Sequence, residues 1–93
     1  MFMPEFLNSN EEWVIFLLGD EFHGTATPEQ IRERTGLDPD QVEEAARNLE
    51  RMRAARIIRL GGKMPPENIQ SIGLQSRGSA LFEDLKKREQ GTS

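Results

Sequence analysis

The sequence predicts a small α+β fold that is mostly helical, with three helices, a two-stranded β-hairpin and a closing C-terminal helix. Two helix starts of the same kind, TPEQ and DPDQ, lie eleven residues apart at residues 27–30 and 38–41. The hydrophobic pattern then changes from helical spacing to the β-branched run RIIRL at residues 56–60. A turn-rich segment, GGKMPPEN, separates this run from a second strand-like run, IQSIGLQ. A chain of 93 residues has room for one domain, so a single domain over residues 1–93 is expected.

An apolar arm at residues 1–8 precedes the first predicted helix, which spans residues 9–19. Ser9 and Glu12 have the spacing of a capping box, in which each side chain binds a free backbone N–H of the first turn. Gly19 is a typical helix stop. The apolar side chains of this helix lie on one stripe, made of Trp13, Phe16 and Leu17.

Two helices joined by a tight turn are predicted next, at residues 27–35 and 38–55, after a loop with an extended pair near Thr25. Each begins with a capping residue, a proline and a glutamine that closes a capping box. Gly36 ends the first helix, and Leu37 in the turn is expected to point inward. The buried stripe of the second helix follows the three-four spacing, with Val42, Ala45, Ala46, Leu49 and Met52.

A hairpin at residues 56–75 and a helix at residues 76–90 complete the predicted fold. The tip of the hairpin is the segment rich in glycine and proline. Three consecutive basic residues near the end of the last helix suit the negative end of the helix dipole. The apolar stripe of this helix consists of Leu81, Phe82 and Leu85.

Charge is divided unevenly along the chain, whose net charge is −4. Residues 1–46 hold eleven acidic and two basic residues, which gives −9, and residues 47–93 hold ten basic and five acidic residues, which gives +5. An acidic protein is a poor general binder of polyanions, but a positive half still allows a local basic patch.

The residue types argue against metal, cofactor and enzyme chemistry. The chain has no cysteine and a single histidine, His23, beside Asp20 and Glu21. A lone imidazole without a thiolate or a second imidazole is a poor metal site, and GGK lacks the spacing of a phosphate loop. No catalytic residues are therefore expected. No apolar run is long enough to span a membrane, and the absence of cysteine favours a cytoplasmic location.

The order of elements, a helix-turn-helix followed by a hairpin, is the layout of a winged helix. The segment TPEQIRERTGLDPDQVEEAARNLERMRAARII resembles the helix-turn-helix of MarR- and PadR-type regulators. IGLQSRGSALFEDLKKR is similar to their second wing strand and its exit, with Leu74, Gln75, Gly78 and Leu81 at the matching positions. The glycine usual between the third helix and its strand is replaced by Ala54, Ala55 and Arg56. The long flanking helices through which MarR proteins dimerise have no counterpart, so sensory-ligand binding is not expected.

The resemblance implies a set of DNA-contacting residues, because the third helix of such proteins enters the major groove and the wing touches the DNA backbone. On that helix the positions are Asp40, Gln41, Glu44, Arg47, Asn48 and Arg51. On the wing they are Arg59 and Lys63, with Arg77 near its base. Arginines suit guanine edges or phosphates, and asparagine suits adenine. The acidic side chains at the start of the helix would repel DNA phosphates, although pairing of Glu43 with Arg47 would neutralise one of them.

Two functional hypotheses follow. The first is a DNA-binding transcriptional regulator whose partner is double-stranded DNA. It is expected to be a homodimer through the N-terminal arm or the C-terminal helix, since palindromic operators need a dimer. The alternative is a winged-helix module that binds a protein partner and makes no direct DNA contact. The apolar residues of the arm and of the last helix also suit a core role, and the stems of Arg53 and Arg56 suit a cover over apolar surface.

Overall fold

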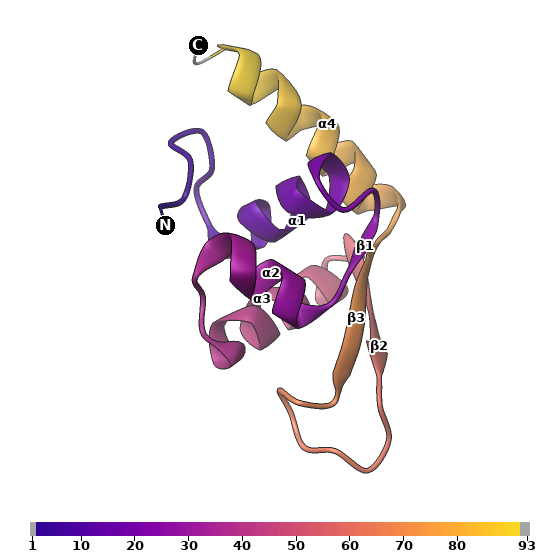
Figure 1. The fold of residues 1–93 in the computed structure, drawn as a ribbon. Coiled ribbons are helices and arrows are strands. Elements are labelled where there is room, and N and C mark those ends of the chain that lie inside the picture. Colours follow the sequence, from indigo (N-terminus) through magenta and orange to yellow (C-terminus); the bar gives the residue numbers. More distant parts are fainter. Residues whose placement is uncertain (1, 92–93) are drawn as a thin grey trace.

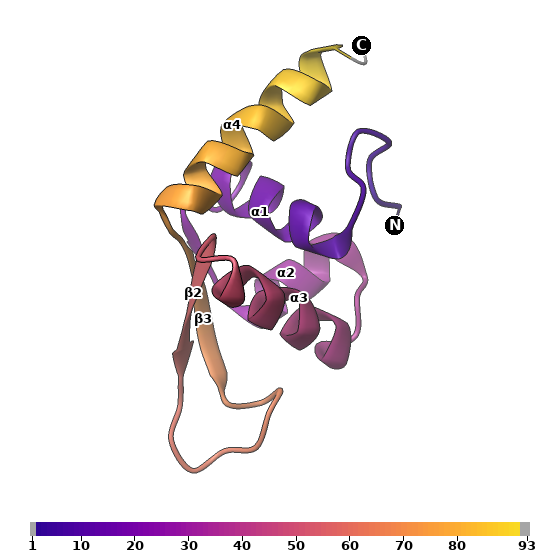
Figure 2. The ribbon, with the colours of Figure 1, turned by 180° about the vertical axis from the view of Figure 1, so that it is seen from behind.

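The computed structural model describes residues 2–91 (Figure 1). The elements along the chain are α1 (Asn10–Asp20), β1 (Thr25–Ala26), α2 (Pro28–Thr35), α3 (Pro39–Arg51), β2 (Ala55–Arg59), β3 (Ile69–Leu74) and α4 (Ser76–Gly91). The predicted fold class, mostly helical α+β with a hairpin and a C-terminal helix, is confirmed. The hairpin loop projects at one end of the molecule and α4 ends at the other (Figures 1 and 2).

The tight pair of helices α2 and α3 forms because both predicted capping boxes close. Thr27 Oγ1 accepts from the N–H of Gln30 at 3.2 Å, and Asp38 Oδ1 accepts from the N–H of Gln41 at 2.8 Å. Each glutamine side chain in turn accepts a hydrogen bond from the backbone N–H of its capping residue. Gly36 ends α2 in the left-handed conformation, with φ at 77°. These local bonds determine where the two helices begin, before any packing is considered.

Helix α3 ends at Arg51, so the predicted end at residue 55 is wrong. Arg53 takes a positive φ of 61°, and the N–H of Ala54 then donates to the carbonyl of Leu49 at 2.9 Å. A left-handed residue just past a helix supplies its last free carbonyls with donors and ends it. Ala54 and Ala55 are buried at the start of β2. Their helix propensity is therefore overridden by their place in the core.

The sheet has three strands in the order β1, β3, β2, so the hairpin prediction of two strands was incomplete. The extended pair near Thr25 is strand β1, which pairs antiparallel with β3. On the inner face, Ile72 of β3 lies opposite both Ala26 of β1 and Ile57 of β2. The β2–β3 register shifts between Ile58 and Arg59, just before the hairpin loop.

The core lies between the inner face of the sheet and the helices. The apolar stripe predicted for α3 is buried through Leu49, but Met52 is 49% exposed because the helix has already ended. Gly19 lies inside α1 and does not end it. A side chain at Gly19 would overlap the ring of Phe82 on α4, so the close packing of α1 against α4 requires glycine there.

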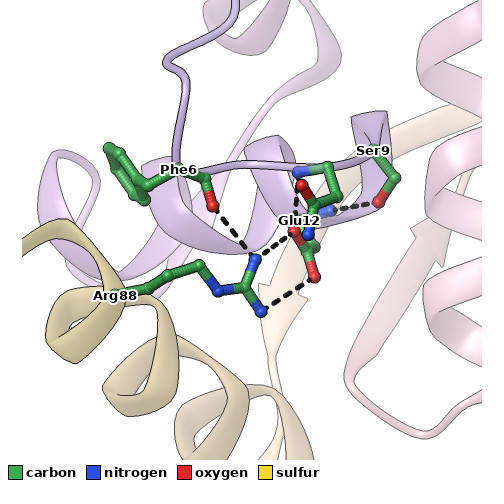
Figure 3. A network of polar contacts seen from close by, with 5 residues as sticks. Phe6, Ser9, Glu12 and Arg88 are labelled. Carbon is green, nitrogen blue, oxygen red and sulfur yellow. Dashed lines mark hydrogen bonds and ion pairs between the residues drawn. The ribbon is translucent and has the colours of Figure 1, made fainter. Parts of the chain in front are cut away.

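A polar network joins the N-terminal arm to α4 (Figure 3). Ser9 Oγ accepts from the N–H of Glu12 at 3.2 Å, but the predicted return bond to Ser9 does not form. Glu12 Oε1 instead accepts from the N–H of Asn8 and from Arg88 Nη1, both at 2.8 Å. Arg88 Nη1 also donates to the carbonyl of Phe6 at 3.0 Å. The carboxylate that would close the capping box is thus bound by Asn8 and by Arg88, which is 76 residues away.

Partial burial raises the pKa of Glu12, but this effect is outweighed. The hydrogen bonds from Arg88 and Asn8, together with the positive charge of Arg88, hold the pKa of Glu12 below its ordinary value of 4.5. Glu12 is therefore ionised at neutral pH and contributes to stability in that form.

Candidate nucleic-acid interface

The outward face of α3 carries one continuous charged stripe. Asp40, Glu44, Arg47 and Arg51 are all exposed, at successive spacings of four, three and four residues. This spacing places them in a row opposite the buried residues of α3, which are Val42, Ala45, Ala46 and Leu49. The row is acidic in its first half and basic in its second. Among residues 2–91, neither Arg47 nor Arg51 has an ion-pair partner, so the expected pairing of Glu43 with Arg47 does not occur.

Two other residues of the predicted set, Gln41 and Asn48, lie beside this row. The side chain of Gln41 accepts from the backbone N–H of Asp38 at 3.0 Å and so is used in capping. Asn48 is half-buried, and its Nδ2 donates to Glu11 Oε2 on α1 at 3.0 Å. Asn48 can contact a base only if it gives up this bond, whereas the arginines of the row need give up no bond.

The two wing cations differ from each other. Arg59 donates from both terminal nitrogens to Glu50 on α3, at 3.2 and 3.3 Å. This bidentate pair fastens the hairpin to the helix and neutralises Arg59 in place. Lys63 is exposed and lines a groove of about 560 Å³ between the wing, α2 and the start of α3. Three carboxylates, Glu29, Glu43 and Glu67, and one further cation, Arg32, line the same groove.

Around the end of α3 the exposed charged side chains include three arginines. Arg51 and Arg53 are exposed there, and α4 begins close by because Gly78 lies against the carbonyl of Ala54. Arg77, the neighbour of Gly78, is exposed as well. Arg77 and Leu81 are one helical turn apart on α4, and Leu81 lines a groove of about 470 Å³ together with Arg51 and Met52. Glu11 and Glu12 of α1 line the same groove. We call Arg51, Arg53 and Arg77 the cationic corner.

Sequence reasoning did not include Arg53 or Arg56 in the site. A role of their stems as cover over apolar surface was one interpretation of the two residues, and both are exposed. The missing glycine between helix and strand was the available signal, because some residue there had to take a left-handed conformation and Arg53 takes it. The corner itself could not be foreseen, since it depends on where α4 packs.

Metal binding and membrane insertion find no matching feature in the part of the chain that the structure describes. No group of three or more histidine, cysteine, aspartate or glutamate side chains is arranged to hold a metal ion within residues 2–91. No helix of that segment is long and apolar enough to cross a lipid bilayer.

Several solved structures share this arrangement of helices and strands. A mutant form of ZitR from Lactococcus lactis, in complex with DNA, superposes with a TM-score of 0.71 over 92% of this chain at 19% identity. The chain has the winged-helix fold. The organohalide-sensing transcriptional regulator RdhR superposes with a TM-score of 0.66 over 94% of the chain at 16% identity. MepR, a transcription regulator of the Staphylococcus aureus efflux pump MepA, gives 0.59 over 84% at 22% identity.

This winged helix spans only part of the proteins that it resembles. It covers 55% of ZitR in the DNA complex, 50% of RdhR and 55% of MepR. No protein-family model and no curated protein sequence matches it. At these identities the likeness establishes the fold, and the regulatory functions named above belong to the similar proteins.

Proposed function

We propose that this winged helix binds double-stranded DNA as a small transcriptional regulator, with α3 facing the major groove. The observation that carries the proposal is the exposed row on α3, in which Arg47 and Arg51 have no partner within residues 2–91. The similar ZitR structure in complex with DNA supports it, because the fold is shared over most of the chain. The predicted protein-interaction alternative has no comparable observation in its favour.

The chemistry of the row suits a groove more than a flat phosphate surface. Each arginine can bind the N7 and O6 acceptors of guanine bidentately or contact a phosphate. Glu44 can accept only from a donor such as the N4 amine of cytosine, and it repels phosphates. Guanine-cytosine pairs therefore match the row best, with guanine at the arginine end and cytosine near Glu44.

Binding of this kind should be local and sensitive to salt. The net charge of −4 gives no general attraction to a polyanion, so affinity must come from a few arginine contacts. Each phosphate contact contributes about 0.9 to the slope of log K against log salt concentration. A shallow but measurable salt dependence is expected, corresponding to a handful of contacts.

Fluorescence anisotropy on labelled duplex, titrated across salt concentrations, tests the proposal. Arg47→Ala and Arg51→Ala should each weaken binding by about tenfold or more, since a good arginine contact is worth about 1–3 kcal/mol. Lys87→Ala is a matched control, because Lys87 is an exposed cation on α4, away from the row. Absence of binding at about 50 mM salt to mixed-sequence and genomic DNA would contradict the proposal.

The predicted homodimer stays a prediction. Both elements assigned to it are partly used within the monomer, since Leu7 of the arm and Leu85 of α4 are buried in the core. Phe6 packs edge-to-face on Phe16, with ring centroids 5.0 Å apart. A dimer would have to use what remains exposed, such as Phe2, which is 95% exposed.

A further inference from the structure

We infer that the phosphate contacts of this protein are concentrated at the cationic corner, Arg51, Arg53 and Arg77, and not at the wing tip. The inference rests on the proposed function and adds to it which part of the surface the DNA backbone follows. It assigns a DNA contact to Arg53, a residue outside the helix row and outside the wing. It also shifts the duplex toward the C-terminal end of α3.

The guanidinium groups of the corner have no partner in the described chain. The three arginines are exposed, and none of their side chains has a hydrogen bond or ion pair within residues 2–91. Two carboxylates of this region are paired with other cations, Glu50 with Arg59 and Glu12 with Arg88. Glu11 accepts a hydrogen bond from the neutral amide of Asn48 and keeps its charge in the groove beside Arg51. The corner therefore offers three arginines without an ion-pair partner against this one carboxylate.

The opposite end of the same surface carries more negative charge. The first half of the α3 row is acidic, with Asp40 and Glu44 exposed. Lys63 at the wing and Arg32 of α2 share their groove with three carboxylates, and Arg59 is bound by Glu50. A phosphate approaching the wing groove meets three carboxylates and two cations, whereas a phosphate approaching the corner meets three arginines and the single unpaired carboxylate of Glu11. Coulomb attraction therefore favours the corner.

The backbone of Arg53 is strained. Its φ of 61° lies in the left-handed region, which a glycine would occupy without strain. No hydrogen bond or ion pair of the Arg53 side chain within residues 2–91 offsets the cost of placing an arginine there. The left-handed conformation serves the end of α3, but a glycine would serve it at lower cost, and strained positions are concentrated at functional sites. An external anion is the partner that this side chain fits.

The path of the duplex follows from the placement of these residues. Arg47 and Arg51 continue the row of α3 toward Arg53, and Arg77 extends it onto the first turn of α4. Leu81 and Met52 line the groove beside Arg51 and supply an apolar edge. α3 and α4 can therefore contact the same DNA backbone. The contact of Gly78 with Ala54 holds the two helices in place relative to each other.

A comparison of two double variants tests the inference. Arg53→Gln with Arg77→Gln removes two corner charges, and Arg59→Gln with Lys63→Gln removes two wing charges, so both lower the net charge of the full chain equally. Anisotropy on the same labelled duplex is measured across salt concentrations, with circular dichroism to show that both variants fold. The corner variant should weaken binding by about tenfold or more and reduce the salt slope by about 2. The wing variant should change affinity less than about threefold.

The outcomes separate the two proposals. If the wing variant loses as much affinity as the corner variant, or more, the inference is wrong while DNA binding stands. If the unaltered protein shows no salt-dependent binding, the proposed function fails and the inference fails with it. Arg53→Lys with Arg77→Lys gives a further check. Lysines should restore most of the affinity and the slope, because phosphate contact requires charge more than geometry.

Discussion

Arg53 holds the left-handed backbone position that ends α3, with φ at 61° and an exposed side chain. The left-handed conformation costs an L-residue about 1–2 kcal/mol, while glycine adopts it freely. Part of that difference is offset because glycine gains entropy in the unfolded chain. The backbone strain at Arg53 thus arises because an arginine lies where the families that this sequence resembles have glycine.

We expect Arg53→Gly to raise the free energy of unfolding by about 0.5–1 kcal/mol, since relief of strain exceeds the added entropy of the unfolded chain. Urea denaturation at neutral pH measures it. Arg51→Gly removes the same charge from an ordinary helical position and should instead destabilise by about 1 kcal/mol. A destabilised Arg53→Gly protein would show that the arginine side chain makes a stabilising contact. If the corner binds DNA, the more stable variant should also be the weaker binder.

At the scale of elements, the contact between α4 and the end of α3 decides how the corner is assembled. Gly78 is buried in the first turn of α4, directly against the carbonyl of Ala54. A Cβ there would overlap that carbonyl oxygen and would lie 2.8 Å from Leu74 Cδ1. The carbonyl also accepts from the N–H of Gln75 at 2.9 Å, so it has little freedom to move.

Gly78→Ala should therefore destabilise the protein by about 1–3 kcal/mol, although alanine is the better helix former. The reason is that backbone, unlike a flexible side chain, must shift to admit the methyl group. Thermal unfolding followed by circular dichroism measures the change. Ser79→Ala, one residue along at an exposed position, should be neutral or slightly stabilising. Equal stability of the two variants would mean that α4 can move away from α3 at little cost.

At the scale of the whole molecule, the two ends of the chain are held together by the Glu12–Arg88 network (Figure 3). Phe6 of the arm, Glu12 of α1 and Arg88 of α4 meet there. The pKa of Glu12 is lowered in the folded protein, so its contribution is fully present above the unfolded value near 4.5. The contribution is lost as the pH falls through the lower folded value.

Glu12→Gln should lower the free energy of unfolding at neutral pH by about 1 kcal/mol, because the charge-assisted bond to Arg88 is weakened. The difference from the unaltered protein should shrink as the pH falls below about 4.5, where Glu12 itself becomes protonated. Urea denaturation at a series of pH values gives both quantities. Glu5→Gln, at an exposed residue outside the network, should show no such trend. A pH-independent difference would mean that packing, not charge, accounts for the effect.

Much of the architecture was predictable because its causes are local. The capping boxes at Thr27 and Asp38 depend on side chains three residues apart, and the hairpin depends on a change of hydrophobic period followed by turn residues. The outward row of α3 follows from helical spacing alone. The DNA-contact residues of the predicted set stay predictions, although the structure shows that Gln41 and Asn48 are engaged elsewhere.

The remainder depended on residues that are distant in sequence. The end of α3, the pairing of β1 with β3 and the bonds of Arg59 to Glu50 and of Asn48 to Glu11 arise only when separate elements meet. Hydrophobic spacing and capping residues were sufficient to predict which helices and strands form and in what order, because both signals act within a single turn of the chain. Which cations stay free was decided by packing, because ion pairs form between elements whose distance only the folded chain determines.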